Sequence, residues 1–399
     1  MLKIALVMRA TVAEISLKNL THNIGQIKAH LKPGVKLCIA VKADAYGHGA
    51  VPCARTVLAS GADFLAVATV DEGMELRNAG IQAPILVLSL CTPSEVADVV
   101  RHTLTPLVFD EDYILLFAQA ARRAGKKGFP VHLAVDTGMG RIGCFPEEAS
   151  ALARLITEAE QGSLSLGGMC THFAASDSAT AQDADYTKAQ FERFTHAIEQ
   201  VRLAGIAPGI CHCANSAASL EKPEYHLDMA RSGITAYGYY PDGKPRSYYA
   251  ARGDSLDLRP VMTLSTQVVS VRRLKKGMSV SYGHTWTAPH DTYIGVLPVG
   301  YADGLLRRFA PFLRVAVGGK SYPVRGRICM DQCMIELGPL SATEAAALRW
   351  QRAVLFGDSA SGALCDAQLL ADETGTISYE VTSAITKRVP RVFDAAGIS

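Results

Sequence analysis

The chain has 399 residues, of which 49% are hydrophobic and 20% are charged, a composition typical of a folded globular protein large enough for two domains. Forty basic residues against 38 acidic ones give a net charge of +2, and the sequence has no long block of one sign. This balance argues against nucleic acid or an anionic membrane surface as a partner, so we expect a small-molecule substrate.

Short apolar runs alternate with longer amphipathic stretches over the first 240 residues. Eight runs favour buried parallel strands: LCIAVK at 37–42, FLAVATV at 64–70, ILVLS at 85–89, PLVF at 106–109, VHLAVD at 131–136, LGGMCTH at 166–172, ICHC at 210–213 and MARSGITAYG at 229–238. Helical patterns such as EDYILLFAQAARRAG at 111–125 lie between them. Eight strand-plus-helix units predict an α/β fold of the (β/α)8 TIM-barrel type, with its site at the carboxyl ends of the strands.

Polar residues end most of these apolar runs, where such a barrel builds its mouth. They are Lys42, Asp136, His172, Asn215 with Ser216, and Arg231. Capping of a strand explains any single one of them, but the whole set favours a functional site. A lysine at the end of a buried strand is the most informative member, because lysines are seldom buried without a chemical purpose.

The composition changes after about residue 240. PDGKPRSYYAARGDSLDLRP at 241–260 reads as a linker, and β-branched alternation follows in MTLSTQVVSVRRL at 262–274 and YIGVLPVG at 293–300. This texture predicts a mostly antiparallel β domain, with short helices at 341–351 and near 371–375. We therefore expect a barrel domain over residues 1–255 and a β-rich domain over residues 256–399.

Signals for export and for metal binding are weak. The opening MLKIALVM is shorter than the apolar core of a signal peptide, and no later run has the length of a membrane span, so a cytoplasmic protein is expected. Ten scattered cysteines fit reduced, buried thiols better than a disulfide scaffold. CHC at 211–213 and CMDQC at 329–333 lack the paired spacing of a structural zinc site, so no metal is expected.

Two cofactor types compete for the barrel. VDTGMGRIG has the spacing of a dinucleotide fingerprint in Gly138, Gly140 and Gly143. It belongs to the fifth unit rather than the first, however, and Asp136 and Arg141 crowd its turn. The alternative is pyridoxal phosphate, whose aldehyde binds a lysine such as Lys42 while hydroxyls and backbone N–H groups hold its phosphate. The pyridoxal phosphate interpretation gives a role to far more of the polar residues that are predicted at the barrel mouth.

A series of motifs extends over both predicted domains. In order they are AVKADAYGHG (40–49), DTGMGRIG (136–143), THFAASD (171–177), ANSAA (214–218), RSGITAYG with YYPD (231–242), VSYGHTW (280–286), VGYADGLLRR (299–308), GRICMDQ (326–332), TISYEV (376–381) and RVPR (388–391). With these motifs the chain resembles the alanine racemases. The resemblance implies a barrel and a β domain, bound pyridoxal 5'-phosphate, a head-to-tail homodimer, and interconversion of L- and D-alanine for cell-wall peptidoglycan.

The resemblance also implies roles for residues around the cofactor. Lys42 matches the lysine that binds the cofactor aldehyde and, once substrate displaces it, acts as one base. The residues that match the family's phosphate site are Tyr46, Ser216, Gly233, Ile234 and Tyr379. Arg231 matches the arginine that faces the pyridine nitrogen; because arginine does not readily give up a proton, that nitrogen should stay unprotonated.

Racemisation needs proton exchange on both faces of the α-carbon, and the resemblance supplies a second base. Tyr282 matches it, with His172 bridging it to the positive charge of Arg231. Arg141 and the backbone of Met330 match groups that bind the substrate carboxylate, and Tyr301 and Tyr379 match a narrow inner gate. The access path to the site corresponds to Asp177, Arg307 and Arg327. The family places the β domain of one subunit over the barrel mouth of the other, so each site would take Lys42 from one chain and Tyr282 from its partner.

One position departs from the family pattern. Many members have a carbamylated lysine directly before VDTGMGR, which braces the substrate-binding arginine, and this chain has Ala134 there. If Arg141 is buried it needs another partner, and we expect a small anion such as chloride or a nearby acid. The departure leaves open a racemase of broader specificity acting on serine or basic amino acids. A non-catalytic pyridoxal phosphate carrier is a further alternative, which would need Lys42 but not Tyr282.

Overall fold

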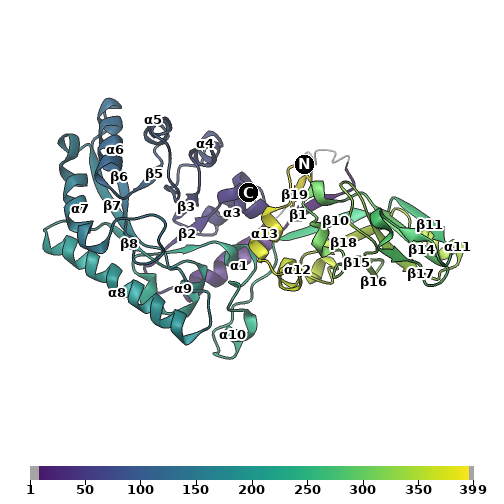
Figure 1. The fold of residues 1–399 in the computed structure, drawn as a ribbon. Coiled ribbons are helices and arrows are strands. Elements are labelled where there is room, and N and C mark those ends of the chain that lie inside the picture. The colour runs from purple at the N-terminus through teal and green to yellow at the C-terminus, as the bar shows by residue number, and fades with distance from the viewer. Residues whose placement is uncertain (1–8, 395–399) are drawn as a thin grey trace.

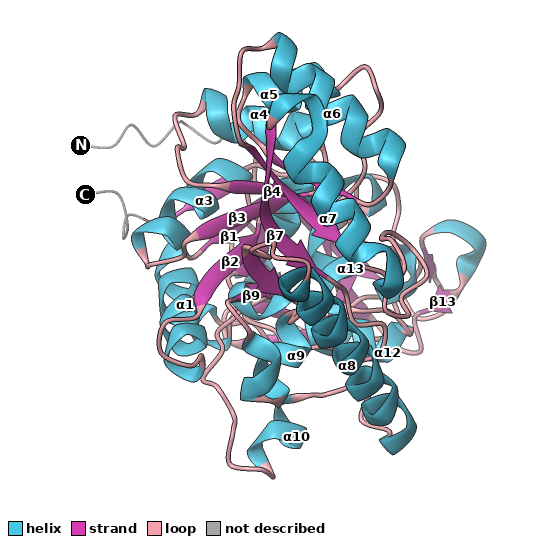
Figure 2. Cartoon of the chain, turned by 90° about the vertical axis from the view of Figure 1, so that its left-hand side faces the viewer, coloured by secondary structure: helices cyan, strands magenta, loops and turns pink. Residues whose placement is uncertain are grey.

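The eight predicted runs form one sheet of eight parallel strands in the computed structural model, which describes residues 9–394. The strands are β2 (Lys36–Ala40), β3 (Phe64–Val67), β4 (Ile85–Val87), β5 (Thr105–Val108), β6 (Phe129–Ala134), β7 (Leu164–Cys170), β8 (Ile210–His212) and β9 (Met229–Ser232), in the spatial order β8-β7-β6-β5-β4-β3-β2-β9. Backbone hydrogen bonds from Asp228 to Cys211 (3.1 Å) and from Arg231 to Ala214 (3.0 Å) join the two end strands. The predicted barrel is therefore confirmed (Figure 2).

Amphipathic helices cover the outside of this barrel. They are α1 (Leu17–His30), α3 (Ala50–Ala59), α4 (Val70–Asn78), α5 (Val96–Arg101), α6 (Glu111–Arg123), α7 (Ala149–Glu158), α8 (Ala181–Leu203) and α9 (Ser216–Glu221). Thr69, Asp110 and Thr180 cap the starts of α4, α6 and α8 by accepting backbone N–H groups of the first turn. Phe117 of α6 and Phe194 of α8 are fully buried, so each helix contributes an apolar stripe to the core.

The second segment forms the predicted β domain, which lies beside the barrel (Figure 1). Its strands are β10 (Met262–Gln267), β11 (Ser270–Leu274), β12 (Ser279–Val280), β13 (Trp286–Thr287), β14 (Thr292–Leu297), β15 (Arg314–Val317), β16 (Lys320–Pro323), β17 (Cys333–Gly338), β18 (Arg352–Phe356) and β19 (Arg391–Phe393). Strands β10 to β18 pair antiparallel among themselves, and β19 pairs with a strand from the start of the described residues. The short helices are α11 (Ala342–Ala347), α12 (Ala367–Thr374) and α13 (Ser378–Ser383).

The first strand of the described residues belongs to the β domain rather than to the barrel. Strand β1 (Val12–Ile15) pairs antiparallel with β10 and parallel with β19 in the sheet of order β16-β15-β18-β10-β1-β19. After β1 the chain forms the barrel and returns to the β domain through the linker that contains α10 (Arg246–Ala250). The division at residues 255 and 256 stays a proposal, and β1 crosses it.

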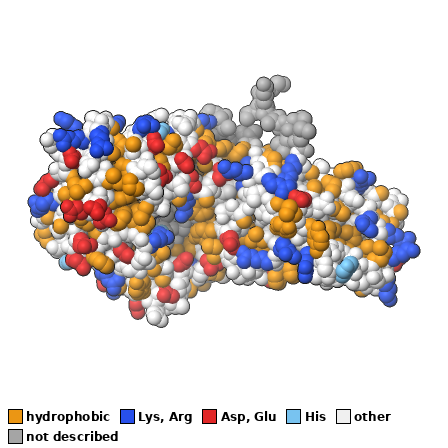
Figure 3. All heavy atoms as spheres, turned by 45° about the horizontal axis from the view of Figure 1, so that its top comes forward, with side chains coloured by type: hydrophobic (Ala, Val, Ile, Leu, Met, Phe, Trp, Pro, Cys, Tyr) orange, Lys and Arg blue, Asp and Glu red, His pale blue; other side chains and the backbone are white. Residues whose placement is uncertain are grey.

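The state of the cysteines, the apolarity of the helices, the possible metal ligands and the surface charge can be compared with the expectations from the sequence. All ten cysteines are free, and eight of them are buried. Between residues 9 and 394 no helix combines the length and apolarity needed to span a membrane, and no group of three or more His, Cys, Asp or Glu is arranged to hold a metal ion. In Figure 3 acidic and basic side chains are interspersed over the barrel, while the visible face of the β domain carries mostly basic ones.

Candidate active site

Lys42 stands at the carboxyl end of β2, as predicted, and a strained turn follows it. In the turn α2 (Lys42–Gly47) the residues from Ala43 to Tyr46 have φ between 52 and 54°, a left-handed conformation that costs a non-glycine residue about 1 kcal/mol or more. The backbone N–H of Ala43 donates to the Glu72 carboxylate at 2.7 Å. Strain of this kind is kept where the surrounding structure holds it, and it concentrates at functional sites.

The Lys42 amine is set up to lose its proton. Burial lowers its pKa below the usual value, the positive charge of Arg141 lowers it further, and the Glu72 carboxylate acts in the opposite direction. A half-buried amine with a lowered pKa is deprotonated more readily than a surface lysine. It can therefore bond to an aldehyde and take up a proton.

Arg231 lies under the same mouth, 8% exposed, with both terminal nitrogens engaged. Nη1 donates to the carbonyl (3.0 Å) and Nδ1 (2.6 Å) of His212. Nη2 donates to the carbonyls of Thr171 (2.9 Å) and Cys213 (3.2 Å) and to His172 Nδ1 (3.3 Å). Among residues 9–394 no acceptor engages Nε, so that N–H is available to a ligand. These contacts hold the Arg231 guanidinium rigidly, as is required of a group that faces the ring nitrogen of a cofactor.

These contacts fix the tautomers of three buried histidines. A guanidinium only donates, so His172 and His212 accept at Nδ1 and carry their proton on Nε2. His212 Nε2 then donates to His132 Nδ1 at 2.8 Å. Burial and the charge of Arg231 lower the pKa of His172 to about 3, so His172 is neutral and the largest positive charge acting on it is that of Arg231. The CHC sequence at 211–213 supports Arg231 in this way.

Acid should weaken the fold through the buried histidines. Burial lowers the pKa of His172 to about 3 and those of His132 and His48 to about 4, against 6.5 for the exposed group. Between these values the unfolded chain binds more protons than the folded chain, so the free energy of unfolding falls as the pH falls, by about 1.4 kcal/mol per pH unit for each histidine.

Urea unfolding across this pH window measures the effect. Burial also lowers the pKa of His212, so His48→Gln removes one of at least four such groups and should flatten the slope of stability against pH by at most about a quarter. The control is His290→Gln, at a histidine whose side chain is 53% exposed. A free energy of unfolding that stays constant from neutral pH down to about pH 5, which is below the usual histidine pKa, would contradict the assignment of these histidines as neutral in the folded chain.

Hydroxyls and a glycine converge where the resemblance places the phosphate. Gly233 N donates to Ser216 Oγ at 2.8 Å, and a Cβ added to Gly233 would lie 2.6 Å from Tyr46 Oη. Ile234 follows in the same buried turn, and the ring of Tyr379 is 5.9 Å from that of Tyr46. Burial raises the pKa of Tyr46 to about 12, so its hydroxyl stays protonated and can donate. Only glycine leaves this space open, and the donors fit an anion.

The other predicted residues cluster on the β domain. Tyr282, Tyr301 and Met330 are exposed by 70%, 39% and 51%. Ser281 Oγ, beside Tyr282, donates to the Arg327 carbonyl at 2.7 Å, and Tyr301 N donates to the Cys329 carbonyl at 3.0 Å. Arg307 and Arg327 line one cavity of about 520 Å³. In the described part of the chain no hydrogen bond or ion pair joins this cluster to Lys42 or His172.

Two predicted residues connect the barrel with the helical end of the β domain. Tyr379 of α13 lies next to Tyr46 of the barrel. Burial raises the pKa of Tyr379 above its usual value, and the neighbouring Tyr46 and the charge of Asp177 raise it further. A single chain therefore assembles the predicted cofactor side of the site and leaves the predicted second base outside it.

The surroundings of Ala134 and Arg141 differ from what we expected. Arg141 is exposed in this chain, so the argument from a buried charge does not apply. Among residues 9–394 it forms no ion pair with a carboxylate. Ala134 belongs to an apolar cluster with Leu107, Cys170 and Ile142. The nearby acid is therefore not found, and an anion such as chloride beside Arg141 stays a prediction.

The structure excludes the dinucleotide interpretation of VDTGMGRIG. Asp136 Oδ1 accepts the backbone N–H groups of Gly138 (2.9 Å), Met139 (2.9 Å) and Gly140 (3.1 Å). These are the donors that a diphosphate would need, and a carboxylate already occupies them. Gly143 is required for another reason, because it has φ 133° and its added Cβ would lie 2.3 Å from Asp136 N.

Comparison with protein families matches both parts of the chain. The alanine racemase N-terminal domain matches residues 15–241, and the alanine racemase C-terminal domain matches residues 261–393. The chain belongs to the alanine racemase family. This is a family of isomerases that depend on pyridoxal phosphate, and the hydroxyl and glycine site around Gly233 fits the phosphate of that cofactor.

Individual alanine racemases resemble the chain over nearly its full length. The alanine racemase of Treponema denticola is 46% identical over 388 residues, which cover 97% of this chain and 98% of the relative. That of Desulfovibrio desulfuricans is 44% identical over 96% of this chain and 98% of the relative. The solved alanine racemase of Streptomyces coelicolor A3(2) has a TM-score of 0.87 at 37% identity, with 98% of this chain and 99% of that chain covered.

Several residues of this alanine racemase site carried no sequence signal. His132 lies inside a strand, Glu72 lies on α4, and both act through partners distant in the sequence. His212 was considered only as part of a metal motif. A helix pattern does not reveal that Glu72 reaches across to the turn after Lys42, because that contact depends on how two barrel units pack.

Proposed function

We propose that the chain interconverts L-alanine and D-alanine with bound pyridoxal phosphate. The observation that carries the proposal is the pairing, at one barrel mouth, of a lysine with a lowered pKa and a buried arginine whose Nε–H is available to a ligand. The relatives named alanine racemase, at 44 to 46% identity, support the choice of substrate.

The residues of this chain would hold the cofactor at three points. Lys42 Nζ would bond to its aldehyde, the hydroxyls of Tyr46 and Ser216 would hold its phosphate with the Gly233–Ile234 backbone, and Arg231 Nε–H would be available to its ring nitrogen. Bound pyridoxal phosphate supplies an electron sink for the pair of electrons left when the α-proton is removed. Arg231 keeps its own protons, which leaves the ring nitrogen unprotonated and weakens the sink. A weak sink favours return of the proton to the α-carbon, as racemisation requires.

Two bases on opposite faces would move the proton. Lys42 Nζ exchanges it on one face, and the oxygen of the partner subunit's Tyr282 exchanges it on the other. His172 carries its proton on Nε2 and can donate to that oxygen, while its Nδ1 accepts from Arg231. Arg141 and the Met330 backbone would hold the substrate carboxylate.

One cluster of site residues surrounds Lys42 on the barrel, and the other surrounds Tyr282 on the β domain. This division leads us to a homodimer with shared sites. Tyr282 is 70% exposed and lies apart from Lys42 of its own chain, so a second copy is needed to complete the site. Tyr301 and Tyr379 would narrow the opening, and Asp177, Arg307 and Arg327 would line the path to it. We place this enzyme in the cytoplasm, where D-alanine would supply peptidoglycan synthesis.

A racemase of broader specificity is the second candidate, and the observation that favours it is the apolar cluster around Ala134 in place of a charged brace for Arg141. Turnover of L-alanine, L-serine and L-lysine by the purified protein, followed by chiral chromatography, separates the candidates. We expect alanine to react at least about tenfold faster than serine or lysine, the discrimination that a small pocket can provide.

Each other outcome points elsewhere. Similar rates on all three amino acids would establish the broader racemase. Full cofactor content with no racemisation of any amino acid would leave the carrier role.

A further inference from the structure

The loops that carry Tyr301 and Met330 touch each other through their backbones. Tyr301 N donates to the Cys329 carbonyl and Ala302 N to the Met330 carbonyl, both at 3.0 Å. A Cβ added to Gly300 would lie 2.3 Å from both carbonyl oxygens. The two loops, residues 300–304 and 329–331, therefore move as one unit if they move at all.

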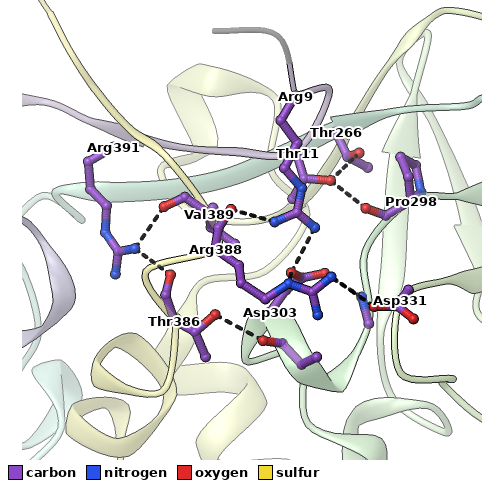
Figure 4. A network of polar contacts seen from close by, with 12 residues as sticks. Arg9, Thr11, Thr266, Pro298, Asp303, Asp331, Thr386, Arg388, Val389 and Arg391 are labelled. Carbon is purple, nitrogen blue, oxygen red and sulfur yellow. Dashed lines mark hydrogen bonds and ion pairs between the residues drawn. The ribbon is translucent and has the colours of Figure 1, made fainter.

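A buried carboxylate holds this unit from behind (Figure 4). Asp303 is 1% exposed, and its Oδ2 accepts the Gly300 N–H at 3.0 Å. Its Oδ1 pairs with Arg9 Nη2 at 2.7 Å and lies 3.5 Å from Arg388 Nε. A buried charge with two arginines and a backbone donor is fully compensated, so it can fix geometry without destabilising the fold.

Arg388 connects the buried carboxylate with the second loop. Its Nη2 pairs with Asp331 at 2.8 Å, one residue after Met330. The neighbouring Thr386 donates its N–H to the Asp303 carbonyl at 3.1 Å and its hydroxyl to the Ala302 carbonyl at 2.9 Å. Both loops are thus attached to the segment 386–391 near the end of the described chain.

The same segment also reaches the turn that follows Lys42. Arg391 Nη1 donates to the carbonyls of Thr386 (2.6 Å) and Val389 (2.8 Å), and its Nε donates to the carbonyl of Gly47 at 2.9 Å. Segment 386–391 is therefore anchored on the barrel through the Arg391–Gly47 contact. On its other side it carries the two loops, as the contacts of Arg388 and Thr386 in Figure 4 show.

We propose that Asp303 and Arg388 are positioning residues, which fix Tyr301 and the Met330 backbone for substrate binding without touching substrate. The inference rests on the proposed function of Tyr301 and Met330. Arg388 is the better residue to change, because its side chain is 47% exposed and Asp303 keeps Arg9 when Arg388 is lost. Removal of Asp303 would instead leave buried donors without a partner.

Steady-state kinetics with L-alanine and D-alanine test the proposal. We expect Arg388→Ala to raise KM about tenfold while kcat changes less than about threefold, because binding is weakened equally in the ground state and the transition state. Arg388→Lys keeps the positive charge without the planar guanidinium, so its KM should lie between those of the wild type and Arg388→Ala. Arg273→Ala, which breaks the exposed Arg273–Asp291 pair of the same domain, is the control and should keep the wild-type KM.

The outcomes separate the two levels of inference. No turnover of alanine by the wild type would contradict the proposed function itself. With an active wild type, an unchanged KM in Arg388→Ala would overturn the positioning role, as would equal losses in all three arginine variants. If Arg388→Ala does not fold, Asp331→Asn removes the outer half of the contact and should raise KM in the same way; an unchanged KM there would overturn the role too.

Discussion

Replacement of Lys42 by alanine is expected to lower the turnover of alanine by about 10³-fold or more. Lys42 combines two roles in the proposed mechanism, since it bonds to the cofactor aldehyde and exchanges the α-proton on one face. Loss of a positioned general base alone typically costs about 10² to 10⁴ in rate. Burial first and then the charge of Arg141 lower the pKa of Lys42, which favours the unprotonated amine that both roles require.

Borohydride reduction followed by peptide mass spectrometry checks the covalent role directly. Reduction of the wild type should fix the mass of the cofactor on the peptide that contains Lys42, and the Lys42→Ala protein should retain none. Lys36 is the matched control, because it lies exposed at the other end of the same strand β2. Cofactor fixed equally to wild type and Lys42→Ala would mean that another lysine binds it.

The sequence predicted the barrel well because its signal is local. Each apolar run of β2 to β8 is followed by a helix, and this alternation is visible in windows of about 20 residues. Strand β1 could not be predicted in the same way. Its four residues pair with β10 about 250 residues later and with β19 near the far end of the described chain, and local periodicity does not encode such partners.

The residues of the candidate site also divide into those with a local sequence signal and those without one. Residues that end strands, such as Lys42 and Arg231, could be found because strand ends meet at the barrel mouth. His132, Glu72 and Asp303 could not, because each acts through a partner that only the folded chain brings near. The exposure of Arg141 in the single chain could not be predicted either, since it depends on loops that no spacing rule describes.

The largest recovery of activity is expected when two inactive variants share a dimer. Tyr282 is 70% exposed and, among the described residues, has no hydrogen bond to Lys42 or His172, whereas the residues of the cofactor side lie together within one chain. If each site takes Lys42 from one subunit and Tyr282 from the other, Lys42→Ala and Tyr282→Phe should each be nearly inactive alone. In their mixed dimer one site carries both defects and the other carries neither. Random assembly should then restore about a quarter of wild-type activity.

Co-expression with two different affinity tags allows the mixed dimer to be isolated before it is measured. The matched control pairs Lys42→Ala with the double variant Lys42→Ala, Tyr282→Phe, because no arrangement of those two chains contains an intact site. Activity that returns in the first mixture and not in the second would require a site built from two chains. Isolated mixed dimers that stay as inactive as the single variants would instead place both bases in one chain, and Tyr282 would then have to reach its own barrel from a position that leaves it exposed in this structure.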